Sequence, residues 1–317
     1  MLLRCLILGM ILIAPARAMR AQTAEFSQPE MLFKSEHWEV VNPKWAPDGE
    51  HIAFSTPQYR GLYVLSRATG FQKMRRLTDE AAAGYAYRWS PDGRYIVARI
   101  ARFDQAHRLD ALHWFGVKDN KSKDLTGFVK DAPGLPQWMR GVDTIGYFKA
   151  ERIHRLSTLI NDTTESIQGA SRKVFIADHM LIITDAGGAI LHQINPVPGN
   201  RYHKAVLSPN DEKIAFQAAG KIYLTSSDGT GLQEIGRGNS PVWSSDGTYL
   251  AYELSKDDGH QYIASDIYAY NLQNNKSINL TSGFGQLAVQ PDWAPDGSSL
   301  IFTTLDEGAI YSIDIEY

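Results

Sequence analysis

Four residues of one stretch have side chains that could bind a metal ion. Asp104, His107, Asp110 and His113 follow one another at intervals of three, and carboxylates and imidazoles both ligate divalent metals. If the stretch were helical, this spacing would bring the side chains onto one side over one or two turns. The alternative is a solvated connection between two strands, with His113 beginning a strand. The sequence favours this alternative, so we expect no metal and no cofactor.

The sequence contains none of the common short catalytic motifs. Gly-x-Ser-x-Gly, which exposes a nucleophilic serine on a strand-turn-helix elbow, does not occur. The P-loop, the dinucleotide fingerprint and His-Glu-x-x-His do not occur either. The single cysteine, Cys5, precedes an apolar run, and no other thiol is available for a disulfide, a nucleophile or a zinc site. We therefore predict no catalytic residues.

A five-residue segment recurs along the chain, and we call it the pentad. Its fullest form is Trp-Ser-Pro-Asp-Gly at residues 89–93. Close copies begin at Trp45, Trp243 and Trp293, and weaker copies begin at Trp138 and Leu207. Asp-Gly favours a tight turn, because Gly adopts positive φ freely and Asp caps its own turn. We assign these turn residues a structural role: Asp48, Gly49, Asp92, Gly93, Asp246, Gly247, Asp296 and Gly297.

The spacing of the pentads indicates the fold. Trp45 and Trp89 are 44 residues apart, and Trp243 and Trp293 are 50 apart, with short strand-like runs between them. Four strands in a period of this length are typical of a β-propeller. The gap from Trp138 to Leu207 is 69 residues and contains three further strand-like runs, which we assign to a degenerate blade at 172–206. The sequence thus predicts an all-β propeller of seven blades, or of six if 172–206 is only an elaboration.

Prolines and the chain ends indicate how the ring is built. A proline lies two residues before a pentad at Pro43, Pro136, Pro241 and Pro291. Proline donates no backbone hydrogen bond and suits an edge strand, so this strand should be the innermost one. The last unit lacks a fourth strand, whereas Met31–Lys34 has no blade of its own. We predict that this N-terminal strand completes the last blade and closes the propeller, which spans 31–317.

These motifs carry a family resemblance. The pentads, the Ile-Ala-Phe and Ile-Tyr strands and the Leu-Thr strand ends resemble the WD-like repeats of TolB-type β-propellers, over residues 43–317. The resemblance implies the fold but no single function. Periplasmic TolB proteins, prolyl-oligopeptidase-type enzymes and oligogalacturonate-lyase-like proteins, whose metal sites at the channel are rich in histidine, share the repeat. TolB proteins also carry an α/β domain before the propeller, and we do not expect one in this sequence.

The N-terminus has the features of a secretory signal peptide. Arg4 is followed by the apolar run Leu6–Ile13, which is too short to span a bilayer, and by Ala16-Arg17-Ala18. We predict a signal peptide over residues 1–18, a loosely held segment over 19–30 and no membrane span in the mature chain. A periplasmic or secreted location follows.

The charge balance and the loops suggest a binding role. With 32 basic and 35 acidic residues, the chain shows no sign of a nucleic-acid partner. Propellers bind through loops on one face, and the loops before the inner strands carry aromatic residues, which often anchor interfaces. These binding candidates are Trp38, Tyr85, Phe128, Tyr202 and Phe284.

We predict a monomeric, non-catalytic scaffold for a protein or peptide. The alternative is a metal-assisted lyase or hydrolase acting on a carbohydrate in the channel. Inward-facing histidines and carboxylates would favour the enzyme, and a mixed or apolar funnel would favour the scaffold. Function should lie where the copies differ, which includes the predicted long loops 101–111 and 255–265.

Overall fold

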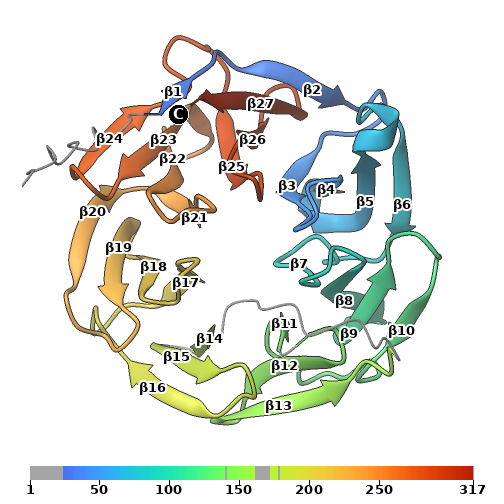
Figure 1. The fold of residues 1–317 in the computed structure, drawn as a ribbon. Helices are drawn as coiled ribbons and strands as arrows, with labels where there is room; N and C mark the ends of the chain where they lie inside the picture. The colour runs from blue at the N-terminus through green and yellow to red at the C-terminus, as the bar shows by residue number, and fades with distance from the viewer. Residues whose placement is uncertain (1–23, 140, 161–171, 178, 317) are drawn as a thin grey trace, which may run out of the picture.

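Seven antiparallel sheets stand around a central channel in the computed structural model (Figure 1). The structure describes residues 24–139, 141–160, 172–177 and 179–316, so the predicted signal peptide lies outside the described residues. The seven-bladed propeller predicted from the pentad spacing is confirmed, and 172–206 contributes a blade of its own. The six-bladed alternative is therefore wrong.

Four blades have the complete set of four strands, and the first strand of each is the innermost. Blade 1 contains β3 (Val41–Trp45), β4 (His51–Thr56), β5 (Arg60–Ser66) and β6 (Met74–Thr78). Blade 2 contains β7 (Arg88–Trp89), β8 (Tyr95–Asp104), β9 (His107–Gly116) and β10 (Ser122–Asp124). Blade 5 contains β17 (Tyr202–Leu207), β18 (Lys213–Ala218), β19 (Lys221–Ser226) and β20 (Gln233–Arg237). Blade 6 contains β21 (Asn239–Trp243), β22 (Tyr249–Asp257), β23 (Tyr262–Asn271) and β24 (Lys276–Asn279).

The other three blades depart from this plan. Within the described residues, blade 3 contains β11 (Gln137–Trp138), β12 (Thr144–Lys149) and β13 (Arg152–Ser157). Blade 4 contains β14 (Arg172–Ala177), β15 (Met180–Asp185) and β16 (Ile190–Ile194). Blade 7 contains β25 (Ala288–Trp293), β26 (Ser299–Thr304) and β27 (Ala309–Glu316). Two 3-10 turns, η1 (Pro57–Tyr59) and η2 (Arg67–Thr69), lie in blade 1.

The N-terminal strand closes the ring as predicted. Strand β2 (Glu30–Lys34) pairs antiparallel with β27, so that blade 7 takes its outer strand from the other end of the chain. Closure removes the unpaired edge that an open last blade would present. It also seals the core, because Phe33 packs among buried residues of blades 1 and 7, including Phe54 and Ile310.

The sequence predicts a loosely held segment over 19–30, and its described part differs from that expectation. Strand β1 (Glu25–Phe26) pairs with the end of β27, beyond the part that β2 covers. The Ser27 amide extends this ladder by donating to the Asp314 carbonyl oxygen at 2.9 Å. Ala24 is buried against blades 6 and 7. Residues 25–27 are therefore paired, because β27 is longer than β2 and leaves backbone groups to pair.

The pentads form tight turns between the inner strand and the next. In the four fullest copies the glycine amide donates to the carbonyl of the second pentad residue at 3.0 Å. The aspartate Oδ1 accepts the amide two residues later, at 2.9 to 3.1 Å. Each glycine has a φ between 69° and 75°, which residues with a Cβ adopt at a cost. The geometry of these residues is that of a structural turn.

Tryptophans of the pentads join neighbouring blades. The indole of Trp89 donates to the Lys44 carbonyl at 3.2 Å, and that of Trp138 donates to the Arg88 carbonyl at 3.0 Å. In both pairs the acceptor is the residue just before the pentad of the preceding blade. Trp243 likewise donates to Val206 at 3.1 Å. The pentad is therefore both a turn and a link between blades.

The prediction of long loops at 101–111 and 255–265 is wrong, because both stretches form paired strands. Strands β8 and β9 pair up to Asp104 and His107, and β22 and β23 pair up to Asp257 and Tyr262. Both faces of these hairpin ends meet solvent, so their polar residues look like loop sequence although the backbone is extended. Among the described residues, no helix has the length and apolar character needed to cross a membrane.

Ring closure can be tested at β2. Replacing Phe33→Ala should cost about 3 to 5 kcal/mol of unfolding free energy, because it leaves a cavity between blades 7 and 1. Met31→Ala on the same strand should cost about 0.5 kcal/mol or less, because Met31 is exposed. Urea denaturation measures both. Equal losses would mean that β2 does not seal this core.

Candidate functional site

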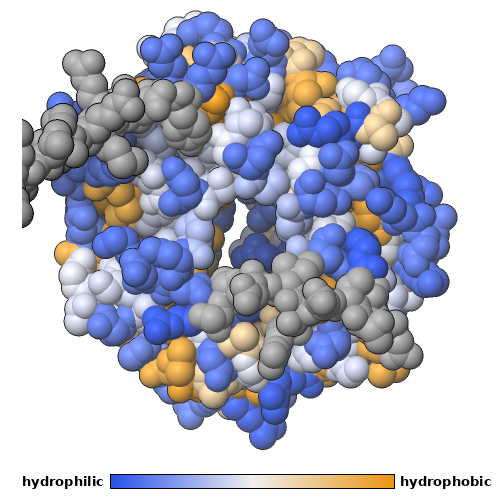
Figure 2. Space-filling model, in the orientation of Figure 1, coloured by the Kyte–Doolittle hydropathy of each residue, from blue (hydrophilic) through white to orange (hydrophobic). Residues whose placement is uncertain are grey.

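All inner strands are entered from the same end of the ring, which we call the entry face. Because the strands of a blade are antiparallel, the connections between second and third strands lie at this face as well. The entry face therefore combines the loops before the inner strands with the ends of the two long hairpins. Figure 2 shows the ring open at its centre, with hydrophilic residues inside the opening.

Four blades have a left-handed residue at equivalent positions near the entry face. Asn42, Ala86, Ser240 and Gln290 each lie three residues before a pentad tryptophan and have a φ between 53° and 58°. This conformation is strained for residues with a Cβ, by roughly 1 to 3 kcal/mol, and such strain often accompanies function. Two of these positions are tied across blades, because the Asn42 amide donates to Gln290 Oε1. The strain is thus repeated around the channel.

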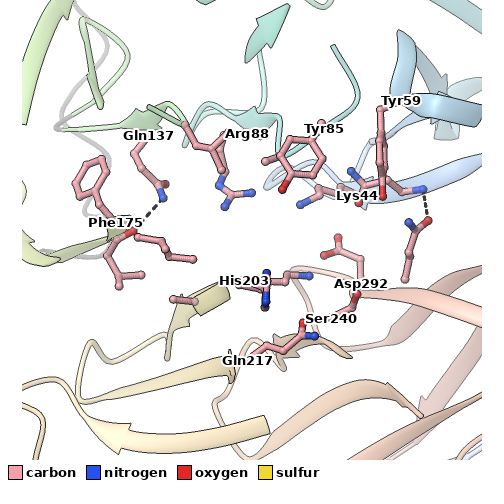
Figure 3. A pocket seen from close by; sticks show the side chains of 18 of the residues that line it. Lys44, Tyr59, Tyr85, Arg88, Gln137, Phe175, His203, Gln217, Ser240 and Asp292 are labelled. Carbon is pink, nitrogen blue, oxygen red and sulfur yellow. Dashed lines mark hydrogen bonds between the residues drawn. The ribbon is translucent and has the colours of Figure 1, made fainter. Parts of the chain in front are cut away.

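A cavity of about 230 Å³ lies in the channel among these strands, and we call it the inner pocket. Blades 1 to 7 all contribute to its wall. Its polar and charged side chains converge on a shared space in Figure 3. The polar and charged lining residues are Asn42, Lys44, Arg88, Gln137, His203, Lys204, Gln217, Ser240, Gln290 and Asp292.

Three basic side chains line the inner pocket. Lys44 and Arg88 precede pentads, and their carbonyls are held by the indoles of the next blade. The Lys44 ammonium also lies 5.4 Å from the centroid of the Tyr87 ring. Lys204 comes from the inner strand of blade 5. Within the described residues, no carboxylate lies within 4.0 Å of any of these three charges.

Two carboxylates stand near the cations, and both already accept backbone hydrogen bonds. Asp292 Oδ2 accepts the Trp45 amide at 2.8 Å, across the junction of blades 7 and 1. Glu253 Oε2 accepts the Gln290 amide at 2.7 Å, and Glu253 is 7% exposed. These carboxylates are therefore engaged in holding the inner strands together.

The crowding of charge shifts the pKa values of the pocket. Burial lowers the pKa of Lys44 well below its usual range, and Arg88 and Lys204 lower it further. Burial also lowers the pKa of Lys204, to about 8, while Asp292 counters part of this effect. Burial raises the pKa of Asp292 to about 6, although Lys44 favours its charged form. Strongly shifted groups around a cavity are typical of functional sites.

One side of the inner pocket is apolar. Blades 3 and 4 supply this wall, which consists of Leu135, Phe148, Val174, Phe175 and Ile176. Blade 4 has no pentad, and its inner strand β14 places three of these residues where other blades place polar ones. The pocket is therefore a mixed funnel, charged on one side and apolar on the other.

Aromatic residues surround the mouth of the pocket. The rings of Tyr59 and Tyr85 meet edge to face, with centroids 5.4 Å apart, and both line the pocket. Tyr85 is 44% exposed and can meet a partner at the entry face. Burial raises the pKa of Tyr59, and Tyr85, Glu253 and Tyr262 raise it further. The contribution of Tyr262 places the blade 6 hairpin near this mouth.

The five predicted aromatic candidates do not form one site. Tyr85 lines the inner pocket, whereas Trp38, although exposed, packs on Tyr63 of the third strand of blade 1 at 5.5 Å. Tyr202 is buried, and its hydroxyl donates to Asn195 Oδ1 at 2.7 Å. Phe128 lies under Arg102, and Phe284 packs on Tyr311.

The four metal-ligand candidates do not converge either. They lie along β8 and β9, where His107 and His113 are six strand residues apart, about 20 Å at the usual rise. Asp110 is buried and paired with Arg108 at 2.7 Å, and His113 lies 3.4 Å from Asp124. Asp104 faces His107 at the hairpin end. Among the described residues, no three potential ligands form a metal-binding group.

Sequence reasoning identified the inner strands but missed their pocket residues. Lys44, Arg88 and Asp292 each directly precede a pentad tryptophan, and Lys204 lies three residues before the weaker copy at Leu207. The prolines had already marked this strand as the one facing the channel. Comparing the residues before the pentads, copy by copy, would have shown that three of them are charged.

Comparisons with solved structures support the fold. The β-propeller domain of Cps50 (Swd1) from Myceliophteria thermophila superposes with a TM-score of 0.59 at 12% identity, covering 91% of this chain and 100% of that one. A chain of the mitotic checkpoint complex gives a TM-score of 0.61 at 13% identity, covering 99% and 98%. At such identities the likeness shows a β-propeller and nothing about function.

Sequence comparisons find partial relatives. TolB of the Tol-Pal system from Alcanivorax borkumensis is 30% identical over 123 residues, 38% of this chain and 27% of TolB. Dipeptidyl-peptidase 5 from Porphyromonas gingivalis is 32% identical over 77 residues, 23% of this chain and 11% of the peptidase. The chain thus matches a minor part of each relative's length. No protein-family model matches the chain.

The electrostatics of the inner pocket can be tested by replacing Asp292→Asn. Asparagine can still accept the Trp45 amide but no longer favours the charged lysine, so the pKa of Lys204 should fall below about 8. Carbon-detected NMR of labelled lysine side chains measures this. Lys221, which pairs with Glu234 on blade 5, is the control. An unchanged Lys204 pKa would show that the two groups do not interact.

Proposed function

We propose that this protein is an exported, non-catalytic scaffold that binds a protein or peptide at the entry face of its propeller. The observation that carries the proposal is the inner pocket, a mixed funnel rimmed by Tyr59 and Tyr85. Aromatic residues at the rim of a concave pocket are the usual anchors of protein recognition.

The composition of the channel favours binding over the alternative of a metal-assisted lyase or hydrolase. The charges in the inner pocket are mostly cationic, and among the described residues His203 is the only histidine in its wall. The histidines and carboxylates of β8 and β9 lie on the hairpin rather than in the pocket wall. A pocket that is rich in lysine and arginine and has an apolar side is better suited to binding a ligand than to coordinating a metal ion.

The two long hairpins extend the surface that a partner could contact. Phe103 at the end of β8 is 66% exposed, and Ile263 near the start of β23 is 59% exposed. These apolar side chains lie on hairpins of blades 2 and 6, which flank the junction of blades 7 and 1 at the entry face. Exposed apolar groups around a polar pocket are typical of interaction surfaces.

The partial match to TolB of the Tol-Pal system supports a binding role without specifying it. The partial match to dipeptidyl-peptidase 5 covers 11% of that enzyme. As part of the proposal, we assign this chain to the TolB-type β-propellers that its repeats resemble. Export to the periplasm or beyond rests on the predicted signal peptide over residues 1–18, and we propose a monomeric propeller over 31–317.

The proposal can be tested with a library of displayed random peptides. Selected peptides should bind the purified protein with micromolar affinity, measured by fluorescence anisotropy. Tyr85→Ala should weaken binding at least tenfold, because a half-exposed aromatic anchor at the mouth contributes more than about 1.4 kcal/mol.

The matched control is Ile278→Ala, which removes an exposed apolar residue from the outer strand of blade 6. It should leave the affinity within twofold. Peptides that bind equally well to both variants would contact another surface, and turnover of a polysaccharide by the purified protein would favour the enzyme instead.

A further inference from the structure

We propose that the inner pocket binds a single carboxylate carried on an apolar group. Within the proposed function, on which this inference rests for its natural ligand, that group is the free C-terminus of a bound peptide. A small apolar carboxylic acid has the same chemistry. The two sources are separated by the experiment below.

The first step is the imbalance of charge. Lys44, Arg88 and Lys204 bring three basic groups to the pocket wall, whereas Asp292 is its one carboxylate among the described lining residues. A second carboxylate, Glu253, is buried near Lys204 but outside the lining. The carboxylates are held by backbone amides of blades 7 and 1 instead of by the cations. Basic groups therefore outnumber carboxylates in the pocket wall, and an entering anion would be attracted to them.

The second step is the charge of the ligand. A carboxylate carries a single negative charge, whereas a doubly charged phosphate would place more negative charge beside Asp292, which lies in the same wall. Arginine and lysine donors bind carboxylates through charge-assisted hydrogen bonds. Arg88 lies between Lys44 and Gln137 along the wall, and all three side chains point into the pocket in Figure 3.

The third step is the apolar wall. Val174, Phe175 and Ile176 of blade 4 also line the pocket. A ligand that places its anionic end on the cations would bury its tail on blades 3 and 4. The cavity of about 230 Å³ is smaller than the roughly 300 to 1,000 Å³ of pockets for drug-sized ligands. It suits one terminal residue better than an extended oligomer.

The aromatic mouth supplies the reason to prefer a peptide. Beyond the terminal residue, the next residues would pass Tyr59 and Tyr85 toward the entry face. A small free acid would fill the pocket but would not contact these two rings. The peptide should therefore bind more tightly than the acid alone.

The titratable groups around the pocket imply a dependence on pH. The titratable and charged groups in the pocket wall are Lys44, Tyr59, Tyr85, Arg88, His203, Lys204 and Asp292. Glu253 lies outside the wall, near Lys204. The anion favours protonated lysine, so affinity should fall as pH rises through about 8, where Lys204 loses its proton. Affinity should rise as pH falls through about 6, where Asp292 becomes neutral.

The experiment compares N-acetyl-Ala-Ala-Phe as the free acid with its C-terminal amide, by isothermal titration calorimetry at pH 7. The acid should bind at least tenfold more tightly than the amide. Lys204→Met should remove this preference, and Lys204→Arg should retain it. Lys221→Met, on the outer part of blade 5, is the matched control and should change nothing.

Further probes identify the source of the carboxylate. If 3-phenylpropanoate binds more weakly than the tripeptide acid, the peptide terminus is supported. If it binds as tightly, the carboxylate site stands, but the proposed peptide scaffold loses its support. Equal binding of acid and amide would overturn the inference while leaving peptide binding intact. Tighter binding of inorganic phosphate than of the carboxylates would also overturn it.

Unfolding of a variant must not be mistaken for loss of the site. The thermal transition of each variant is therefore measured alongside its affinity. The Lys204→Arg protein keeps the charge and distinguishes a role in binding from a role in packing. Loss of the acid preference in a folded Lys204→Arg protein would contradict a simple charge-based site.

Discussion

The hydrogen bond from a pentad indole to the preceding blade is the interaction on which the rest of the ring depends. An indole buried between two sheets needs an acceptor, since an unpaired N–H in such a place costs stability. Trp89 and Trp138 find theirs in the inner strand of the neighbouring blade. In each case the acceptor is the residue that precedes the neighbour's pentad. The same bond that joins two blades therefore fixes the residue whose side chain lines the channel, and Lys44 and Arg88 are held in this way.

In the part of the chain that the structure describes, the indole hydrogen bond between blades is absent near the junction where the two ends of the chain meet. The indoles of Trp45 and Trp293 have no hydrogen-bond partner among the described residues. At the first of these, the Asp292 carboxylate accepts the backbone amide of Trp45 instead. A buried carboxylate is unfavourable unless charge or hydrogen bonds compensate it, and the cations of blades 1, 2 and 5 provide part of that compensation. Ring closure and the charge of the inner pocket thus depend on the same residue.

Much of the fold could be predicted, because it depends on local and repeated signals. The Asp-Gly turns act within a few residues, and their spacing indicated seven blades and the closing strand β2. The hairpin ends at 101–111 and 255–265 could not be predicted, since exposed paired strands have the composition of loops. The inner pocket could not be predicted, because it exists only in the closed ring. Lys44 and Lys204 are 160 residues apart in the sequence and meet only because seven inner strands surround one channel.

The degenerate blade is what makes this channel directional. A ring of identical blades would present the same residues on every side, and a ligand in it could adopt any rotation. Blade 4 has no pentad and contributes Val174 and Ile176 where other blades contribute polar residues. This places an apolar wall beside the cationic one, so a ligand with a charged end and an apolar end can bind in only one orientation. The loss of the repeat in one blade therefore provides what the repeat alone does not, a pocket with two different sides.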